Sequence, residues 1–309
     1  MSLHQASGQW KLGLVLALAT AACWATLPIA LKVSLEALDP ITLTWFRFLV
    51  AAGLMGAWLA ARGRLGAYRA LGPRGWGLLA LAAVMLVGNY VLYLLGVQLT
   101  TPGNAQVLIQ LAPLLMALGG IVVFGERYAP AQWLGLAIIL GGLALFFHDQ
   151  WRGGGETPRG YLLGSALVVV GAGVWAVYAL AQKQLLQSLD SSAVLWIVYV
   201  VATLCLWPFA RPSTLASLDA THALMLGYCA LNTLVAYGAF AEALAHWEAS
   251  RVSAVLATTP LLCLASVAVV HALWPAGLAP EAVGVTGYVG AVAVVVGSAM
   301  SSLLGRQRA

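Results

Sequence analysis

Ten long apolar segments divide the chain, and they constrain its fold more than any other feature. A helix needs about 20 mostly apolar residues to cross roughly 30 Å of lipid hydrocarbon. Because the bilayer interior holds no water, a spanning segment has to satisfy its own backbone N–H and C=O groups, as a helix does. The sequence therefore predicts an all-α integral membrane protein with ten transmembrane helices. Their approximate ranges are 12–32, 41–61, 76–97, 103–124, 131–148, 160–182, 192–210, 222–241, 250–271 and 283–304.

The composition leaves little room for a soluble domain. The chain is 62% hydrophobic and 8% charged, whereas a soluble domain carries roughly 25% charged residues. The longest polar connector, residues 149–159, is too short to bury a core. The net charge of +5 comes from basic residues scattered between apolar segments. We therefore expect a lipid bilayer around the chain and no nucleic-acid partner.

The positions of Lys and Arg predict the orientation, because cytoplasmic loops are enriched in positive charge. With the N-terminus placed inside, four basic residues lie outside, and they are Lys32, Arg152, Arg159 and Arg211. Ten lie on the cytoplasmic side, and they are Lys11, Arg62, Arg64, Arg69, Arg74, Arg127, Lys183, Arg251, Arg306 and Arg308. The sequence thus predicts a multi-pass protein of a bacterial-type inner (plasma) membrane with both termini in the cytoplasm.

The chain also contains an internal duplication, a feature that decides the fold wherever it occurs. Early residues recur 151 positions later without a gap, so that Trp24-Ala25, Lys32, Leu38-Asp39 and Trp45 return as Trp175-Ala176, Lys183, Leu189-Asp190 and Trp196. Later residues recur at steps of 147 and 155. Tyr90, Tyr93 and Pro113 return as Tyr237, Phe240 and Pro260, and Trp133, Gly135 and Gly142 return as Tyr288, Gly290 and Gly297.

We interpret residues 1–148 and 160–309 as two five-helix repeats, and residues 149–159 as an extracytoplasmic connector. Five helices is an odd number, so the second repeat is inverted in the membrane relative to the first. Inverted repeats are an architecture of secondary transporters, in which the substrate site lies near the bilayer midplane between the repeats.

Several short motifs, taken in order, resemble the EamA branch of the drug/metabolite transporter superfamily. The first repeat carries Trp24-Ala25, Arg47, Gly103-Asn104-Ala105, Leu111-Ala112-Pro113-Leu114-Leu115, Phe124-Gly125-Glu126-Arg127 and Gln132-Trp133-Leu134-Gly135. The second repeat keeps Ala249-Ser250-Arg251-Val252 and Thr259-Pro260-Leu261-Leu262. It departs from the pattern where Gly-Glu-Arg is expected, and has His271-Ala272-Leu273-Trp274-Pro275 there.

This resemblance implies a ten-helix carrier with a central cavity lined by helices 1, 3, 4, 6, 8 and 9. Members of the family mostly export small metabolites. Aromatic and other amino acids are among the cargoes of YddG-type relatives.

Aromatic and amide side chains at the expected repeat interface are the candidates for substrate binding. An amide in hydrocarbon costs free energy unless it finds a partner, so it faces the bundle or a wet cavity. The candidates are Trp24, Asn89, Tyr93, Gln106, Gln110, Trp175, Tyr178, Asn232 and Tyr237. Gln106 and Gln110, four residues apart, are expected on one helix face. Hydrogen bonding between helices remains the alternative for the amides, and core packing for the two Trp.

Two prolines and one arginine lie inside expected spans. Pro113 and Pro260 are expected to kink their helices in the middle, either as hinges for alternating access or as static bends. Arg47 is expected to pair with a loop carboxylate such as Asp39, or to extend outward to the interface, rather than to contact substrate.

Glu242 and His246 lie four residues apart at the end of the eighth expected span. A His beside a carboxylate can carry a coupling proton. The alternative is that both are ordinary charges at the cytoplasmic end of the helix.

The sequence contains no motif for catalysis, phosphate binding or metal ligation, so we expect no enzyme activity, cofactor or metal. It predicts a secondary transporter that exports small amphipathic metabolites, above all aromatic or hydrophobic amino acids, by alternating access through a central cavity. One alternative is an exporter of drugs or other metabolites. Another is an integral-membrane enzyme acting on a lipid-linked substrate with residues 242–251. The oligomeric state is open, and a monomer is slightly favoured.

Overall fold

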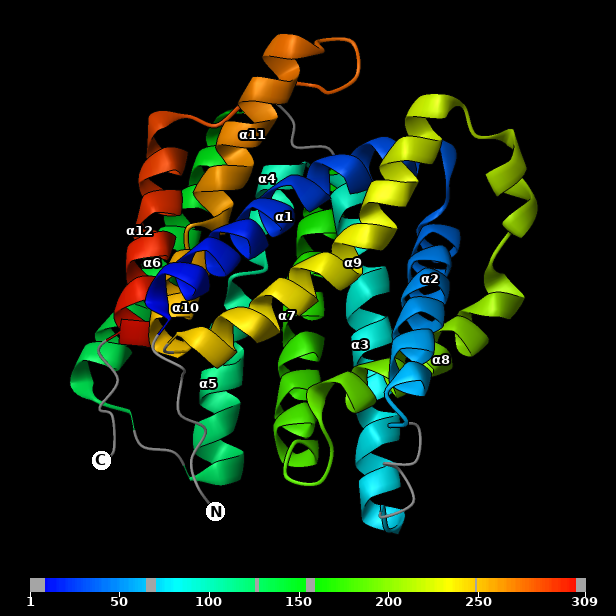
Figure 1. Cartoon of the computed structure of the whole chain (residues 1–309). Helices are drawn as coiled ribbons and strands as arrows, with labels where there is room; N and C mark the ends of the chain where they lie inside the picture. Colours follow the sequence, from blue (N-terminus) through cyan, green and yellow to red (C-terminus); the bar gives the residue numbers. More distant parts are fainter. Residues whose placement is uncertain (1–8, 65–70, 126–127, 154–158, 248, 304–309) are drawn as a thin grey trace.

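The computed structural model describes residues 9–64, 71–125, 128–153, 159–247 and 249–303, and these residues form helices and connecting turns without a strand (Figure 1). The first half of the chain has α1 (Trp10–Ala37), α2 (Pro40–Ala61), α3 (Pro73–Leu99), α4 (Pro102–Leu108), α5 (Leu111–Phe124) and α6 (Pro130–Gly153). The second half has α7 (Arg159–Leu185), α8 (Ser191–Leu206), the short 3₁₀ turns η2 (Trp207–Phe209) and η3 (Pro212–Ser217), α9 (Ala220–His246), α10 (Ala249–Leu256), α11 (Thr259–Leu273) and α12 (Val285–Leu303).

The prediction of an all-α, multi-pass membrane protein is confirmed. Within the described ranges, eight helical stretches are long and apolar enough to cross a bilayer. Two shorter apolar helices, Leu114–Val123 and Val285–Ser301, accompany them. Each of the ten expected ranges contains helix, and the number that crosses the membrane remains a prediction.

Short polar signals set the starts of several helices. Asp39 is the N-cap of α2, where its side chain accepts hydrogen bonds from the backbone N–H groups of Ile41 and Thr42, at 3.0 and 2.9 Å. Thr101 caps α4 in the same way. In both cases a proline follows, at the first helical position, where its missing N–H costs no hydrogen bond.

The fourth and ninth expected spans are each broken into two helices. The first breaks between α4 and α5 at residues 109–110, and the second between α10 and α11 at residues 257–258. Ile109, Gln110 and Thr258 keep helical backbone angles, so each break is a short turn. It lies just before Pro113 or Pro260, where the missing N–H removes a backbone hydrogen bond. Each proline lies in the first turn of the second segment, which tolerates a residue without an N–H. Whether these bends are hinges or static remains a prediction.

The most extensive helix pairs are α6 with α12, α3 with α7 and α1 with α9, followed by α2 with α8. In Figure 1 the α6–α12 pair forms one end of the molecule and the α2–α8 pair forms the other, with α1 and α9 running side by side between them. The steps of 151, 147 and 155 residues assign each helix of the first half a counterpart in the second. Under this assignment the α3–α7 pair becomes the α9–α1 pair, and the two members of the α2–α8 pair and of the α6–α12 pair are each other's counterparts.

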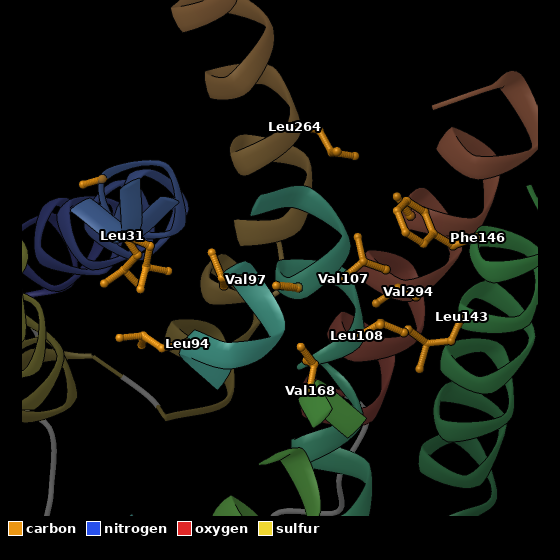
Figure 2. Packing of buried hydrophobic residues seen from close by; sticks show 14 of the residues in the cluster. Leu31, Leu94, Val97, Val107, Leu108, Leu143, Phe146, Val168, Leu264 and Val294 are labelled. Carbon is orange, nitrogen blue, oxygen red and sulfur yellow. The ribbon is translucent and has the colours of Figure 1, made fainter. Parts of the chain in front are cut away.

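Part of the buried apolar core lies beside the break in the fourth span. Figure 2 shows Val107 and Leu108 of α4 within a cluster that also receives Leu31 from α1, Leu94 from α3 and Phe146 from α6. These side chains come from four helices, so the short helix α4 is held from several directions. This packing fixes where the span is interrupted.

Two pairs of glycines allow α6 and α12 to pack with their backbones in contact. A Cβ placed on Gly142 would lie 2.6 Å from the carbonyl oxygen of Gly290, and one on Gly290 would lie 2.6 Å from that of Gly142. Gly135 and Gly297 meet in the same reciprocal way, at 2.7 and 2.6 Å. Small residues at such crossings let membrane helices approach closely.

We expect Gly142→Ala to destabilise the protein by about 1–3 kcal/mol, because the new methyl group has to push backbone apart. Gly141→Ala is the matched control, because a Cβ there meets nothing within 4 Å. Thermal unfolding of the two purified variants in one detergent measures the difference. Equal midpoints for both variants would contradict the close α6–α12 packing.

Candidate functional site

Aromatic side chains from both halves of the chain meet where α1 packs on α9. The ring of Trp24 lies 5.6 Å from that of Tyr237, edge to face, and 5.8 Å from that of Phe240. On α7, the rings of Trp175 and Tyr178 lie 6.4 Å apart. Trp24, Tyr237 and Trp175 are half-buried, whereas Tyr178 is buried. The structure therefore brings Trp24 and Tyr237 together, as a site between the two halves requires.

Two of the candidate amides tie helices of the first half to helices of the second. Asn89 Nδ2 on α3 donates to the carbonyl oxygen of Gly171 on α7 at 2.9 Å. Asn232 Nδ2 on α9 donates to the carbonyl oxygen of Cys23 on α1 at 2.8 Å and to the hydroxyl of Tyr228 at 3.1 Å. Both side chains are buried. In this conformation the two amide nitrogens hold helices together.

The two candidate glutamines lie on either side of the break in the fourth span. Gln106 is buried in α4, where its Oε1 accepts a hydrogen bond of 3.1 Å from the hydroxyl of Tyr93 on α3. Gln110 is the residue just before α5. The expectation that Gln106 and Gln110 share a face of one helix is wrong, because α4 ends at Leu108. Gln110, half-buried, lies at the break itself.

Arg47 lies inside the protein, and both expectations for it are wrong. Its side chain is 2% exposed, so it does not extend outward. Asp39 is engaged at the start of α2, where it also accepts from the Thr42 hydroxyl at 2.6 Å. The guanidinium instead reaches α9, where Nε donates to the carbonyl oxygen of Cys229 at 3.3 Å and Nη2 to the hydroxyl of Thr233 at 3.2 Å. Burial among helices far apart in the sequence overrides the local partner.

Glu242 and His246 lie within hydrogen-bond distance near the end of α9, with 3.1 Å between Oε1 of the carboxylate and Nε2 of the ring. The Glu242 side chain is 62% exposed. The pair lies beyond Tyr237 toward the end of the helix. A role in proton coupling stays a prediction.

Sequence reasoning missed a carboxylate that joins the loop between α11 and α12 to the start of α4. Glu281, in the loop between α11 and α12, accepts a hydrogen bond of 2.5 Å from the backbone N–H of Gly103 at the start of α4. The same loop is held by Asp149 of α6, whose carboxylate accepts from the N–H of Gly284 at 2.7 Å. Nearby, Lys32 Nζ donates to the carbonyl oxygens of Val97 and Gln98 at the end of α3.

The signal for Glu281 was present in the sequence. At the step of 155 that relates the last helices of the two repeats, Glu281 is the counterpart of Glu126 in the Gly-Glu-Arg motif. The carboxylate is displaced from residues 271–275 by an insertion, which is why comparison of adjacent motifs overlooked it.

Burial raises the pKa of the Glu281 carboxyl above its ordinary value of 4.5, against the opposing effects of Thr101, the N–H groups of Gly103 and Asn104, and Lys32. The folded protein therefore binds this proton more tightly than the unfolded chain does. The stability that this provides is complete below the ordinary pKa and is lost as pH rises through the raised value.

We expect Glu281→Gln, which cannot ionise, to raise the unfolding midpoint at pH 8, and this gain should shrink as pH falls toward 5. Thermal unfolding of both proteins across that range measures the difference. Asp219→Asn is a control of opposite sign, because the backbone N–H and side chain of His222 lower the pKa of Asp219. A pH-independent gain from Glu281→Gln would contradict the assignment.

A hollow of about 370 Å³ lies where α1, α10 and α12 meet. Its lining is mostly apolar and includes Leu18, Trp247, Val255 and Leu303, with Arg251 as a charged member. Among the described residues, no three His, Cys, Asp or Glu side chains lie close enough together to hold a metal ion.

Comparison with known protein families gives a match over most of the chain. The profile of the EamA-like transporter family matches residues 11–148 and again residues 162–303. A solved crystal structure that is 20% identical superposes with a TM-score of 0.65, covering 97% of this chain and 98% of the other, which shows a shared fold.

Curated relatives extend over nearly the same length. An Escherichia coli K12 protein described as the uncharacterized inner membrane transporter YhbE is 38% identical, over 96% of this chain and 92% of its own. A Haemophilus influenzae protein described as an uncharacterized transporter is 33% identical, over 94% and 95%. An Escherichia coli K12 protein described as a probable amino-acid metabolite efflux pump is 26% identical, over 82% and 85%.

Proposed function

The chain belongs to the EamA-like transporter family, as a multi-pass transporter of the inner membrane, and we propose that it exports amino acids with aromatic or hydrophobic side chains. The cargo leaves the cytoplasm by alternating access, through a site between the two halves of the chain. The observation that carries this proposal is the contact of Trp24 with Tyr237, an aromatic wall built by α1 and α9 from different halves.

We propose that residues 1–148 and 160–309 are inverted copies of one five-helix unit joined by residues 149–159. Two observations support this arrangement. The α3–α7 and α1–α9 pairs are counterparts of each other, and the fourth and ninth spans are broken at equivalent places. The start of α1 and the end of α12 lie on the same side in Figure 1, which agrees with both termini being cytoplasmic.

The broken spans supply the movement in this proposal. A helix end at residues 109–110 or 257–258 leaves backbone groups outside the regular ladder, and such breaks act as joints when they line a transport path. Pro113 and Pro260 keep the joints from closing into continuous helices. In this proposal the aromatic side chains of the site, such as Trp24 and Tyr237, then face one side of the membrane at a time.

The cargo class rests on two supports. Aromatic rings attract amphipathic molecules with aromatic or apolar side chains. In addition, a relative that matches 82% of this chain is described as a probable amino-acid metabolite efflux pump.

We expect purified protein in liposomes to catalyse counterflow of radiolabelled phenylalanine or leucine. Trp24→Ala and Trp175→Ala should each lower the initial rate by about tenfold, because each removes one aromatic contact with the cargo together with the apolar area that this contact buries. Trp133→Ala is the matched control, because Trp133 is exposed on α6.

Rates that are unchanged by both substitutions would remove these tryptophans from the transport path. A wild-type protein that moves cationic dyes and no amino acid would replace the amino-acid proposal with drug export.

A further inference from the structure

Arg47 carries a positive charge in the interior with only neutral neighbours. It lies about two turns into α2 and is 2% exposed. Within the described part of the chain, no carboxylate lies within the 4.0 Å of an ion pair with its guanidinium. Ionisable residues inside spans are costly and mark substrate paths unless a partner explains them. The fold therefore leaves the charge of Arg47 without a counterion.

The hydrogen bonds that Arg47 makes are few and long. A guanidinium has five N–H donors, and here Nε and Nη2 share two acceptors, the Cys229 carbonyl and the Thr233 hydroxyl, at 3.2–3.3 Å. Bonds from a guanidinium to a carboxylate are typically about 2.7–2.9 Å and paired. The present contacts satisfy Arg47 only in part.

The surroundings of Arg47 suit a planar ligand group. The guanidinium carbon lies 5.0 Å from the centre of the Tyr90 ring, which holds the plane of the charge by a cation–π contact. Thr233 belongs to the same helix as Asn232 and Tyr237, and Tyr90 to the same helix as Asn89 and Tyr93. Arg47 thus touches two of the helices that carry candidate site residues, α3 and α9.

The internal duplication provides a comparison within one molecule. The counterpart of Arg47, 151 residues later, is Val198 on α8, which is fully buried. The next residues, Phe48 and Tyr199, are also counterparts, and their rings stack on each other at 5.6 Å, so this place lies where the two repeats meet. An apolar side chain fills the equivalent position in the second half. The packing of the fold therefore does not require a charge at Arg47.

We propose that Arg47 binds the carboxylate of the cargo, which defines the cargo as a carboxylate with an apolar or aromatic side chain. The inference rests on the proposed export of amino acids and names the group that the site recognises. In this structure Thr233 and Cys229 hold the guanidinium. A bound carboxylate replaces them with two shorter, charge-assisted hydrogen bonds, and the side chain of the cargo lies toward Trp24 and Tyr237.

The alternative role for Arg47 is a structural clamp between α2 and α9. The two roles differ in ligand chemistry, because a clamp does not distinguish a carboxylate from an amine. They also differ in the effect of removing the Thr233 hydroxyl. A structural contact between α2 and α9 loses an acceptor and becomes weaker. A carboxylate site loses only a group that competes with the ligand for the guanidinium of Arg47.

Calorimetric titration of the purified protein with three related probes tests the proposal. We expect wild type to bind phenylalanine and phenylacetate and not phenethylamine, which lacks the carboxylate. Arg47→Met should weaken binding of both carboxylates by about 30-fold or more, because charged hydrogen bonds are lost. Arg47→Lys keeps the charge but lacks the planar guanidinium, so its affinity for the carboxylates should lie between those of wild type and Arg47→Met.

Two further variants guard the interpretation. Arg62→Met is the matched control, because Arg62 is an exposed arginine at the end of α2 that lies over a Trp ring, 5.3 Å from its centre, and its loss should leave binding unchanged. Thr233→Val should retain phenylacetate binding. Thermal unfolding shows whether each variant is folded.

Binding of phenethylamine as tight as that of phenylalanine, or equal binding by wild type and Arg47→Met, would overturn the carboxylate role and leave amino-acid export standing. Failure of wild type to bind either carboxylate would also overturn it. Binding of phenylacetate that depends on Arg47, without counterflow of any amino acid, would support the carboxylate site and overturn the proposed cargo.

Discussion

The absence of water inside the bilayer is the constraint on which the rest of this structure depends. Every buried polar group has to find a partner within the protein, and here the partners come from distant parts of the chain. Asn89 reaches a carbonyl on α7, and Asn232 reaches one on α1. The hydrogen bonds of these amide nitrogens are the same contacts that join the first half to the second. Polar side chains therefore gather at the interface where a transporter needs its site.

Several contacts between the two halves are reciprocal, but the chemistry of the paired positions differs. Gly142 and Gly290 meet reciprocally between α6 and α12, and Phe48 stacks on its own counterpart Tyr199. Arg47 and Val198 occupy equivalent places but differ by a full charge. A carrier built from two similar halves can open to either side with similar packing, whereas a cargo with one charged end needs an asymmetric site. The difference at Arg47 provides that asymmetry.

The sequence predicted the properties that depend on local composition. Length and apolarity located the helical ranges, including the second span at residues 41–61, which agrees with the start of α2 after Asp39. The short turn at residues 109–110 was not predicted, because its place depends on the packing of α4 against α1, α3, α7 and α11 as well as on Pro113. The partners of Arg47 were missed since they lie more than 180 residues away and depend on how α2 meets α9. Glu281 was missed because an insertion displaces it from residues 271–275, where the comparison of the repeats placed the Gly-Glu-Arg motif.

The central claim is that the cargo binds between the halves, against Trp24 and Tyr237. The most direct test is a structure of the protein with 4-bromophenylalanine, with the bromine located by its anomalous scattering. The account predicts bromine beside the ring of Trp24, with the carboxylate of the ligand at the Arg47 guanidinium. Bromine in the hollow lined by Leu18, Trp247 and Val255, with none near Trp24, would contradict it.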